Sequence, residues 1–84
     1  MPRYLVEAYV PRSRAREARA AGRHARAAAE ELVKEGTPVR YVRMTFLPND
    51  ETCFHIFEAE SKEAVGEACR RAGIGTGRIV PAVE

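Results

Sequence analysis

The stretch VRYVRMTFLPNDETCFHIFEA, residues 39–59, contains the pattern that decides the fold. Residues 39–47 and 52–59 each alternate between two sets of side chains, which is the period-two pattern of a β-strand. The residues PND at 48–50 lie between them and are typical of a turn. The stretch therefore predicts a β-hairpin.

Two elements precede this hairpin. YLVEAYV (4–10) is rich in β-branched and aromatic residues and stops at Pro11, which favours a strand. Residues 13–35 consist mainly of the strong helix formers Ala, Arg, Glu and Leu, and Gly36 follows them. The sequence therefore predicts a strand and then a long helix before the hairpin.

Two further elements follow it. Ser61 can cap a helix over residues 62–72, and Gly73 is placed to end that helix. RIVPAV (78–83) predicts a last strand, and its Pro81 requires an edge position because proline lacks the N–H that a central strand needs. The complete order is βαββαβ.

This order predicts an α+β fold, a ferredoxin-like βαββαβ sandwich forming one domain over residues 1–84. Right-handed crossovers place both helices on one face of a four-stranded antiparallel sheet. The first and third strands then lie in the centre, and the other face of the sheet is left bare.

Composition limits the class of protein. With 84 residues, the chain is short enough that a lone copy should be marginally stable, which favours oligomerisation. It contains neither a long apolar run nor a charged leader, so we expect a cytoplasmic protein with no membrane partner. We also expect both cysteines to be free thiols. A net charge of +2 does not by itself imply a polyanionic partner.

Alternation assigns the strand residues to two faces of the sheet. The set expected under the helices is Val6, Ala8, Val10, Val42, Met44, Phe46, Phe54 and Ile56. The set expected on the bare face is Leu5, Glu7, Tyr9, Tyr41, Arg43, Thr45, Cys53, His55 and Phe57. Because that bare face is too apolar to stay exposed on a small monomer, we predict a homodimer interface that encloses a polar pocket.

The first predicted helix carries two stripes. Small residues recur along one face and allow close packing on the sheet: Ala18, Ala21, Gly22, Ala25, Ala28, Ala29 and Leu32. Arginines recur along another face: Arg12, Arg16, Arg19, Arg23 and Arg26. No phosphate loop or aromatic RNA-binding motif accompanies the arginines, so we interpret them as a solvated face and expect no nucleic-acid partner.

Three segments resemble those of a known family: MPRYLVEAYVP (1–11), VRYVRMTFLPNDETCFHIFEAESKEAV (39–65) and ACRRAGIGTGRIVPA (68–82). The chain resembles the small domain-of-unknown-function family numbered forty-two forty-two, which includes nickel-binding proteins. The resemblance implies a ferredoxin-like fold, a homodimer of the dimeric α+β barrel type, and nickel as a candidate ligand. Relatives that resemble metal binders carry histidines in the first strand, where this chain has Glu7 and Tyr9.

Three residues are the candidate metal ligands: His55, Glu7 and Cys53. Nickel accepts imidazole, carboxylate and thiolate donors. The alternatives are that His55 and Glu7 form a hydrogen-bonded pair in a pocket wall, and that Cys53 is a small buried hydrophobe. The candidate residues for binding a small molecule are Tyr9, Tyr41 and Arg43. We expect His24 to lie on the surface or to serve in packing, and Cys69 to lie in the core.

The residues favour a small non-catalytic dimeric protein that binds a transition metal or a small molecule on the bare sheet face. The alternative function is that of a dimeric α+β barrel enzyme, monooxygenase-like or isomerase-like, which the fold alone permits. Cys53 and His55 lie two residues apart on one strand, a spacing of roughly 6–7 Å that needs favourable rotamers for proton transfer. We therefore predict no catalytic residue.

Overall fold

The computed structural model describes residues 1–75 and 77–83. In chain order the elements are β1 (Arg3–Tyr9), α1 (Ala15–Lys34), β2 (Val39–Leu47), β3 (Thr52–Ala59), α2 (Lys62–Ala72) and β4 (Arg78–Ala82), with 3₁₀ turns at Arg12–Arg14 and Pro48–Asp50. The predicted order βαββαβ is confirmed, and the predicted ends lie within two residues of the observed ones.

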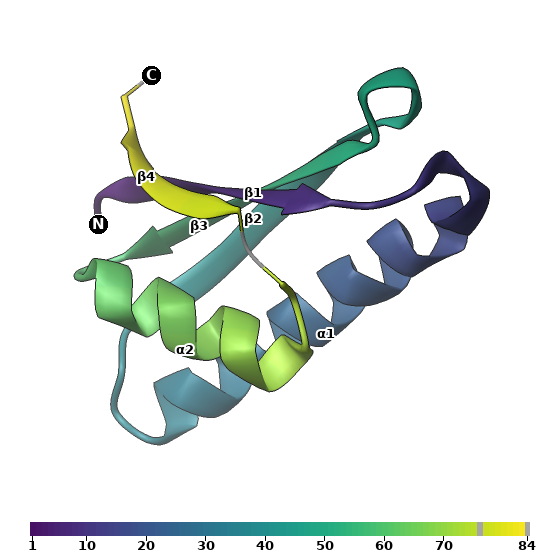
Figure 1. Ribbon diagram of the computed structural model, residues 1–84. Helices are drawn as coiled ribbons and strands as arrows, with labels where there is room; N and C mark the ends of the chain where they lie inside the picture. The colour runs from purple at the N-terminus through teal and green to yellow at the C-terminus, as the bar shows by residue number, and fades with distance from the viewer. Residues whose placement is uncertain (76, 84) are drawn as a thin grey trace.

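The strands form one antiparallel sheet in the order β2-β3-β1-β4. Both helices lie on the same side of this sheet, and the described residues leave its other side uncovered (Figure 1). We call that other side the open face. Pro81 lies on the edge strand β4, as its missing N–H requires. The ferredoxin-like α+β fold is confirmed.

Short-range signals set the ends of α2. The hydroxyl of Ser61 accepts a hydrogen bond from the backbone N–H of Ala64 at 3.2 Å, so the serine caps the first turn. Gly73 takes the left-handed conformation at φ 73°, which a residue with a side chain rarely adopts, and it ends the helix. This cap returns the chain directly toward the edge of the sheet where β4 pairs.

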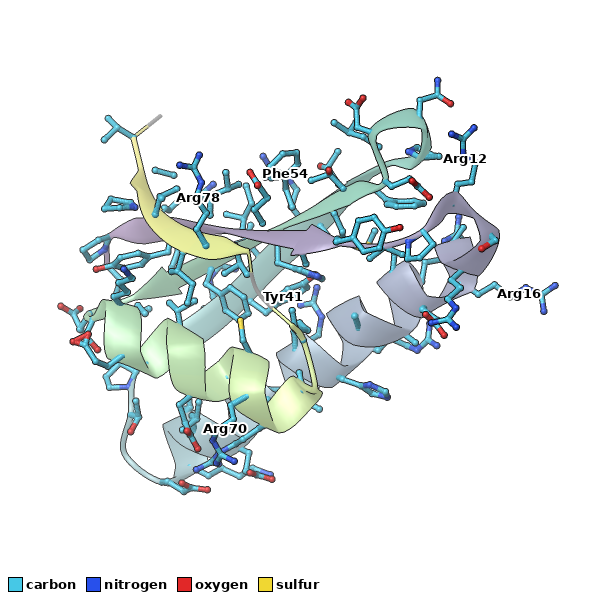
Figure 2. The ribbon with its side chains drawn as sticks, in the orientation of Figure 1. Arg12, Arg16, Tyr41, Phe54, Arg70 and Arg78 are labelled. Carbon is cyan, nitrogen blue, oxygen red and sulfur yellow. The ribbon has the colours of Figure 1, made fainter. Side chains whose placement is uncertain are left out.

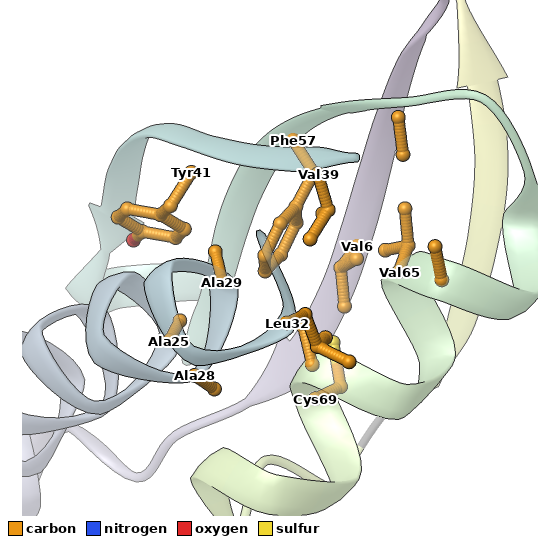
Figure 3. Close-up of a cluster of buried hydrophobic side chains, with 13 residues drawn as sticks. Val6, Ala25, Ala28, Ala29, Leu32, Val39, Tyr41, Phe57, Val65 and Cys69 are labelled. Carbon is orange, nitrogen blue, oxygen red and sulfur yellow. The ribbon is translucent and has the colours of Figure 1, made fainter. Parts of the chain in front are cut away.

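The core lies between the sheet and the helices (Figure 3). Its largest side chains are aromatic, and the rings of Tyr41 and Phe57 meet edge to face with centroids 5.1 Å apart. The helix α1 contributes mostly small side chains to this core, as predicted: Ala18, Gly22, Ala25, Ala28, Ala29 and Leu32 are buried and Ala21 is half-buried. Cys69 is buried in the core, also as predicted.

The two faces of β3 are the reverse of the prediction. Cys53, His55 and Phe57 lie under the helices and are at most 1% exposed. Phe54 and Ile56, predicted to lie there, are on the open face and half-buried. Both sets contain apolar side chains, so the alternation of this strand does not by itself identify the inner face.

A β-bulge changes the phase of β2. The register with β3 shifts between Tyr41 and Arg43, which leaves Val42 as an extra residue. Tyr41 therefore lies under the helices and is 4% exposed, although strict alternation placed it on the open face. After the bulge Met44 pairs with His55, so its assignment to the helix side was right.

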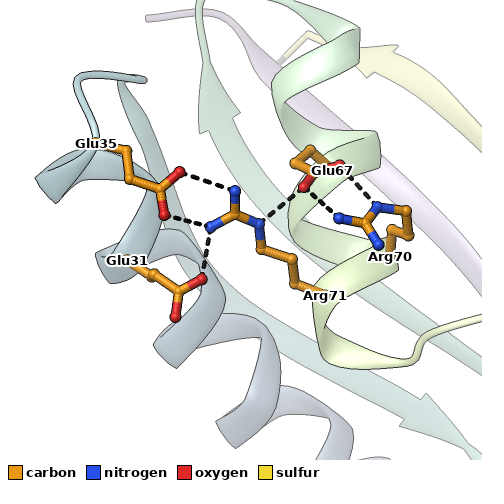
Figure 4. Close-up of polar contacts among 5 residues, drawn as sticks. All are labelled: Glu31, Glu35, Glu67, Arg70 and Arg71. Carbon is orange, nitrogen blue, oxygen red and sulfur yellow. Dashed lines mark hydrogen bonds and ion pairs between the residues drawn. The ribbon is translucent and has the colours of Figure 1, made fainter.

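An ion-pair network joins the two helices at their outer surface (Figure 4). The guanidinium of Arg71 on α2 bridges to Glu35 and Glu31 of α1, with both contacts to Glu35 at 2.8 Å. Its Nε also donates to Glu67, which in turn accepts from Arg70. One arginine thus links α2 to the end of α1.

No helix among the described residues has the length and apolarity needed to cross a membrane.

Candidate functional site

A cavity of about 320 Å³ opens at one end of the helix layer. The end of β1, the first half of α1 and the turn after α2 surround it. Its walls are mostly small or apolar, and four of its lining residues carry functional groups: Tyr9, Glu17, His24 and His55. A pocket of this size with a few polar groups is the usual form of a small-ligand site.

His55 is buried under the helices and is 1% exposed. Its Nδ1 lies 2.8 Å from the hydroxyl of Tyr41, and its Nε2 lies 3.5 Å from Sγ of Cys53. Burial lowers the pKa of His55 to about 4, because the imidazolium would lose its hydration. The ring is therefore neutral at pH 7, with one nitrogen free to act as a donor and the other as an acceptor.

The two partners of His55 are also uncharged at neutral pH. Burial raises the pKa of Tyr41 to about 12 and raises the pKa of the Cys53 thiol. The side-chain rotamers bring Cys53 and His55 into contact, which the strand spacing alone did not predict. However, the pair is a thiol beside a neutral imidazole, not the thiolate and imidazolium of an activated nucleophile.

The structure separates Glu7 from the other two predicted metal ligands. Glu7 pairs with Phe54 and Arg78 in the sheet register, on the open face, whereas Cys53 and His55 point toward the helices. The prediction that these three side chains share one face is wrong, because the phase of β3 is reversed. His55 takes Tyr41 as its partner instead of Glu7.

The predicted small-molecule ligands lie in two places. Tyr9 is 70% exposed and lines the cavity beside His55. Tyr41 and Arg43 line a separate groove between α1 and β2. The structure therefore brings Tyr41 and Arg43 together but places Tyr9 apart from them.

Two cavity residues were not predicted as site residues. His24 is on the surface, as expected, but its side chain lines the same cavity as His55, and Glu17 does so as well. Glu17 precedes Ala20 and Ala21 of the cavity wall by three and four residues, and His24 follows them by four and three. That spacing along α1 could have identified both residues. Within residues 1–75 and 77–83, no three His, Cys, Asp or Glu side chains are grouped closely enough to hold a metal ion.

Residues 4–82 match the family described as nickel responsive protein SCO4226-like. The chain belongs to this family. The family resemblance inferred from the sequence is thereby confirmed. No curated protein matches the sequence.

The SCO4226-like fold is also seen in a solved structure, the crystal structure of SCO4226 from Streptomyces coelicolor A3(2). The two chains superpose with a TM-score of 0.63 and are 19% identical, and the match covers 98% of this chain and 99% of that chain. At this identity the match supports the ferredoxin-like fold and says nothing of individual side chains.

Proposed function

We propose that this protein is a small, non-catalytic, homodimeric binding protein whose ligand is a transition metal, with nickel as the first candidate. The observation that carries the proposal is the contact between His55 Nε2 and Cys53 Sγ, beside a cavity that His55 lines. A neutral imidazole and a thiol that can lose its proton are two donors that nickel accepts. The description of the family as nickel responsive also favours nickel as the ligand.

His55 and Cys53 would hold the ion. The positions of the other potential donor side chains determine which of them could join the site. Glu7 lies on the open face and cannot join them within one subunit. His24 and Glu17 line the same cavity, and a rotamer change of His24 would add a third donor. The metal would supply a Lewis-acidic centre, and water would complete its coordination.

Protonation of the two donors sets the pH dependence of binding. His55 is already neutral, because its pKa is about 4, so protons compete for its ring only in acid. Cys53 has a raised pKa and must release its proton when a metal binds. Nickel affinity should therefore increase with pH, up to about tenfold per pH unit, across the neutral range.

Calorimetric titration of the metal-free protein with Ni²⁺ tests this proposal. We expect His55→Gln and Cys53→Ser to lose most of the affinity, and the near-isosteric serine to abolish the thiolate-to-metal absorption band. Glu7→Gln is the matched control, since it removes a candidate donor from the other face and should leave binding unchanged. Loss of nickel binding in Glu7→Gln, or an absence of nickel binding by the wild type, would contradict the cavity site.

The open face supports the homodimer part of the proposal. Leu5 lies between Ile56 and Val80 in the sheet register, so apolar side chains form a row across three strands. Phe54 and Arg78 are on the same side, away from the helices, whereas Tyr41 is on the helix side (Figure 2). An apolar row of this kind on a short chain is typical of a buried interface.

Charge makes this face complementary to a second copy of itself. It carries Glu7 together with Arg78, so a two-fold arrangement can oppose carboxylates and guanidinium groups. Glu58, at the margin, is already paired with Arg3 at 3.0 Å and Arg40 at 2.9 Å. We therefore propose a second copy of this chain as the partner of the open face.

A further inference from the structure

Four arginines surround a groove of about 330 Å³ between α1 and the edge strand β2. The helix contributes Arg19, Arg23 and Arg26, which are three or four residues apart and so lie on one face. The strand contributes Arg43 from the opposite side. The groove is separate from the cavity that contains His55.

No carboxylate lines this groove. Several arginines outside the groove are neutralised: Arg71 contacts three glutamates, and Arg3 and Arg40 share Glu58. Within residues 1–75 and 77–83, none of the four groove arginines has an acidic oxygen within 4.0 Å. Four guanidinium groups therefore line this groove without a carboxylate among its lining residues.

Two features of the packing shape the groove. Gly22 faces it from α1, and a Cβ at this position would lie 3.0 Å from the Tyr41 hydroxyl and 3.5 Å from Sδ of Met44. The absence of a side chain at Gly22 lets the Tyr41 hydroxyl and the Met44 thioether approach the helix closely at this wall of the groove. The guanidinium of Arg26 lies 5.2 Å from the centre of the Tyr41 ring, a cation-π contact that holds one arginine against the groove wall.

We propose that this groove binds a small phosphorylated molecule through its diphosphate group. Guanidinium groups recognise phosphate oxygens with paired, charge-assisted hydrogen bonds, and here they approach one small volume from two elements. A single-stranded nucleic acid would also need exposed rings on which bases stack. Tyr41, the aromatic residue of the groove, is 4% exposed and cannot serve.

Titration with inorganic pyrophosphate at constant ionic strength, on metal-free protein, tests the proposal. We expect Arg23→Gln and Arg43→Gln each to weaken binding about tenfold or more, since each removes a charge-assisted contact from one side of the groove. Arg16→Gln is the matched control, because it removes the same charge from an exposed site on α1 outside the groove. It should change the affinity less than twofold.

Three results would overturn the proposal. One is an absence of pyrophosphate binding by the wild type. Another is an equal loss in Arg16→Gln, which would indicate diffuse attraction along the helix instead of a groove. The third is tighter binding of a single-stranded RNA oligonucleotide than of pyrophosphate, which would indicate an extended polyanion as the ligand. None of these outcomes depends on nickel binding.

Discussion

The hydroxyl of Tyr41 lies 2.8 Å from Nδ1 of His55, and both side chains are buried between the sheet and α1. This contact joins the two strands of the hairpin, and His55 extends it to Cys53 on its other side. Every polar side-chain atom buried in the described part of the chain has a partner. Tyr41 and Cys53 therefore provide a partner for each ring nitrogen of His55. Without these partners the imidazole would be costly to bury.

Replacing Tyr41 with Phe should destabilise the fold by about 1–3 kcal/mol, because it leaves Nδ1 of His55 buried without its partner. The phenyl ring retains the packing against Phe57, so the loss reports the hydroxyl alone. Urea denaturation measures the effect. Tyr9→Phe is the control: its ring is 70% exposed, and we expect a change within about 0.5 kcal/mol.

Stability of the metal-free protein should depend on pH through His55. Its pKa falls from 6.5 to about 4 on burial, so the unfolded chain binds a proton at a higher pH than the folded one. The contribution is fully present above pH 6.5 and is lost as the pH falls toward 4, by about 3 kcal/mol in all. Denaturation at a series of pH values measures this slope.

His55→Gln separates this effect from that of the carboxylates. The pKa of Glu67 is held at about 2 by Arg70 and Arg71, so its contribution is lost only below about pH 4.5. We expect the variant to have a flat stability profile between pH 6.5 and 4.5. A wild-type slope that persists in the variant would show that another group titrates in this window.

The element order was predictable because local signals agree with the fold. The turn at Pro48–Asp50, the cap at Ser61 and the left-handed Gly73 are each determined by one or two residues. Register and face are different, because they depend on which of two apolar sets is buried. In β3 the charged Glu58 lies on the same face as Phe54 and Ile56, whereas the apolar Ala59 lies on the same face as His55. This difference favours burial of the face that carries His55, as observed.

The candidate site was only partly predictable for the same reason. His55 and Cys53 were recognised from their residue types, but their partner Tyr41 was assigned to the wrong face. The bulge at Val42 changes the phase of β2, and no glycine marks it in the sequence. A partner chosen by strand alternation alone is wrong wherever a bulge intervenes.

Neighbouring substitutions on β3 should separate folding from dimerisation. Phe57→Asp places a charge in the core, where the native ring is fully buried, and should unfold the chain. Ile56→Asp places the same charge on the open face and should leave a folded monomer. Circular dichroism and analytical ultracentrifugation distinguish these outcomes. A monomeric wild type, or an Ile56→Asp variant that remains dimeric, would contradict the proposed interface.

Arg71 should contribute more to stability than Arg70, although the two are adjacent and equally charged. Arg71 contacts Glu31 and Glu35 across the helix interface, whereas Arg70 pairs with Glu67 within its own helix. Arg71→Met should therefore lower Tm by several degrees and raise the pKa of Glu35 toward its usual value, since Arg71 is the main cause of its depression. Arg70→Met should lower Tm much less, because an exposed pair within one helix contributes little. Thermal denaturation at low and high salt tests both variants. The difference in Tm between them should shrink at high salt, because salt screens the network. Equal Tm values at low salt would show that packing alone holds the two helices together.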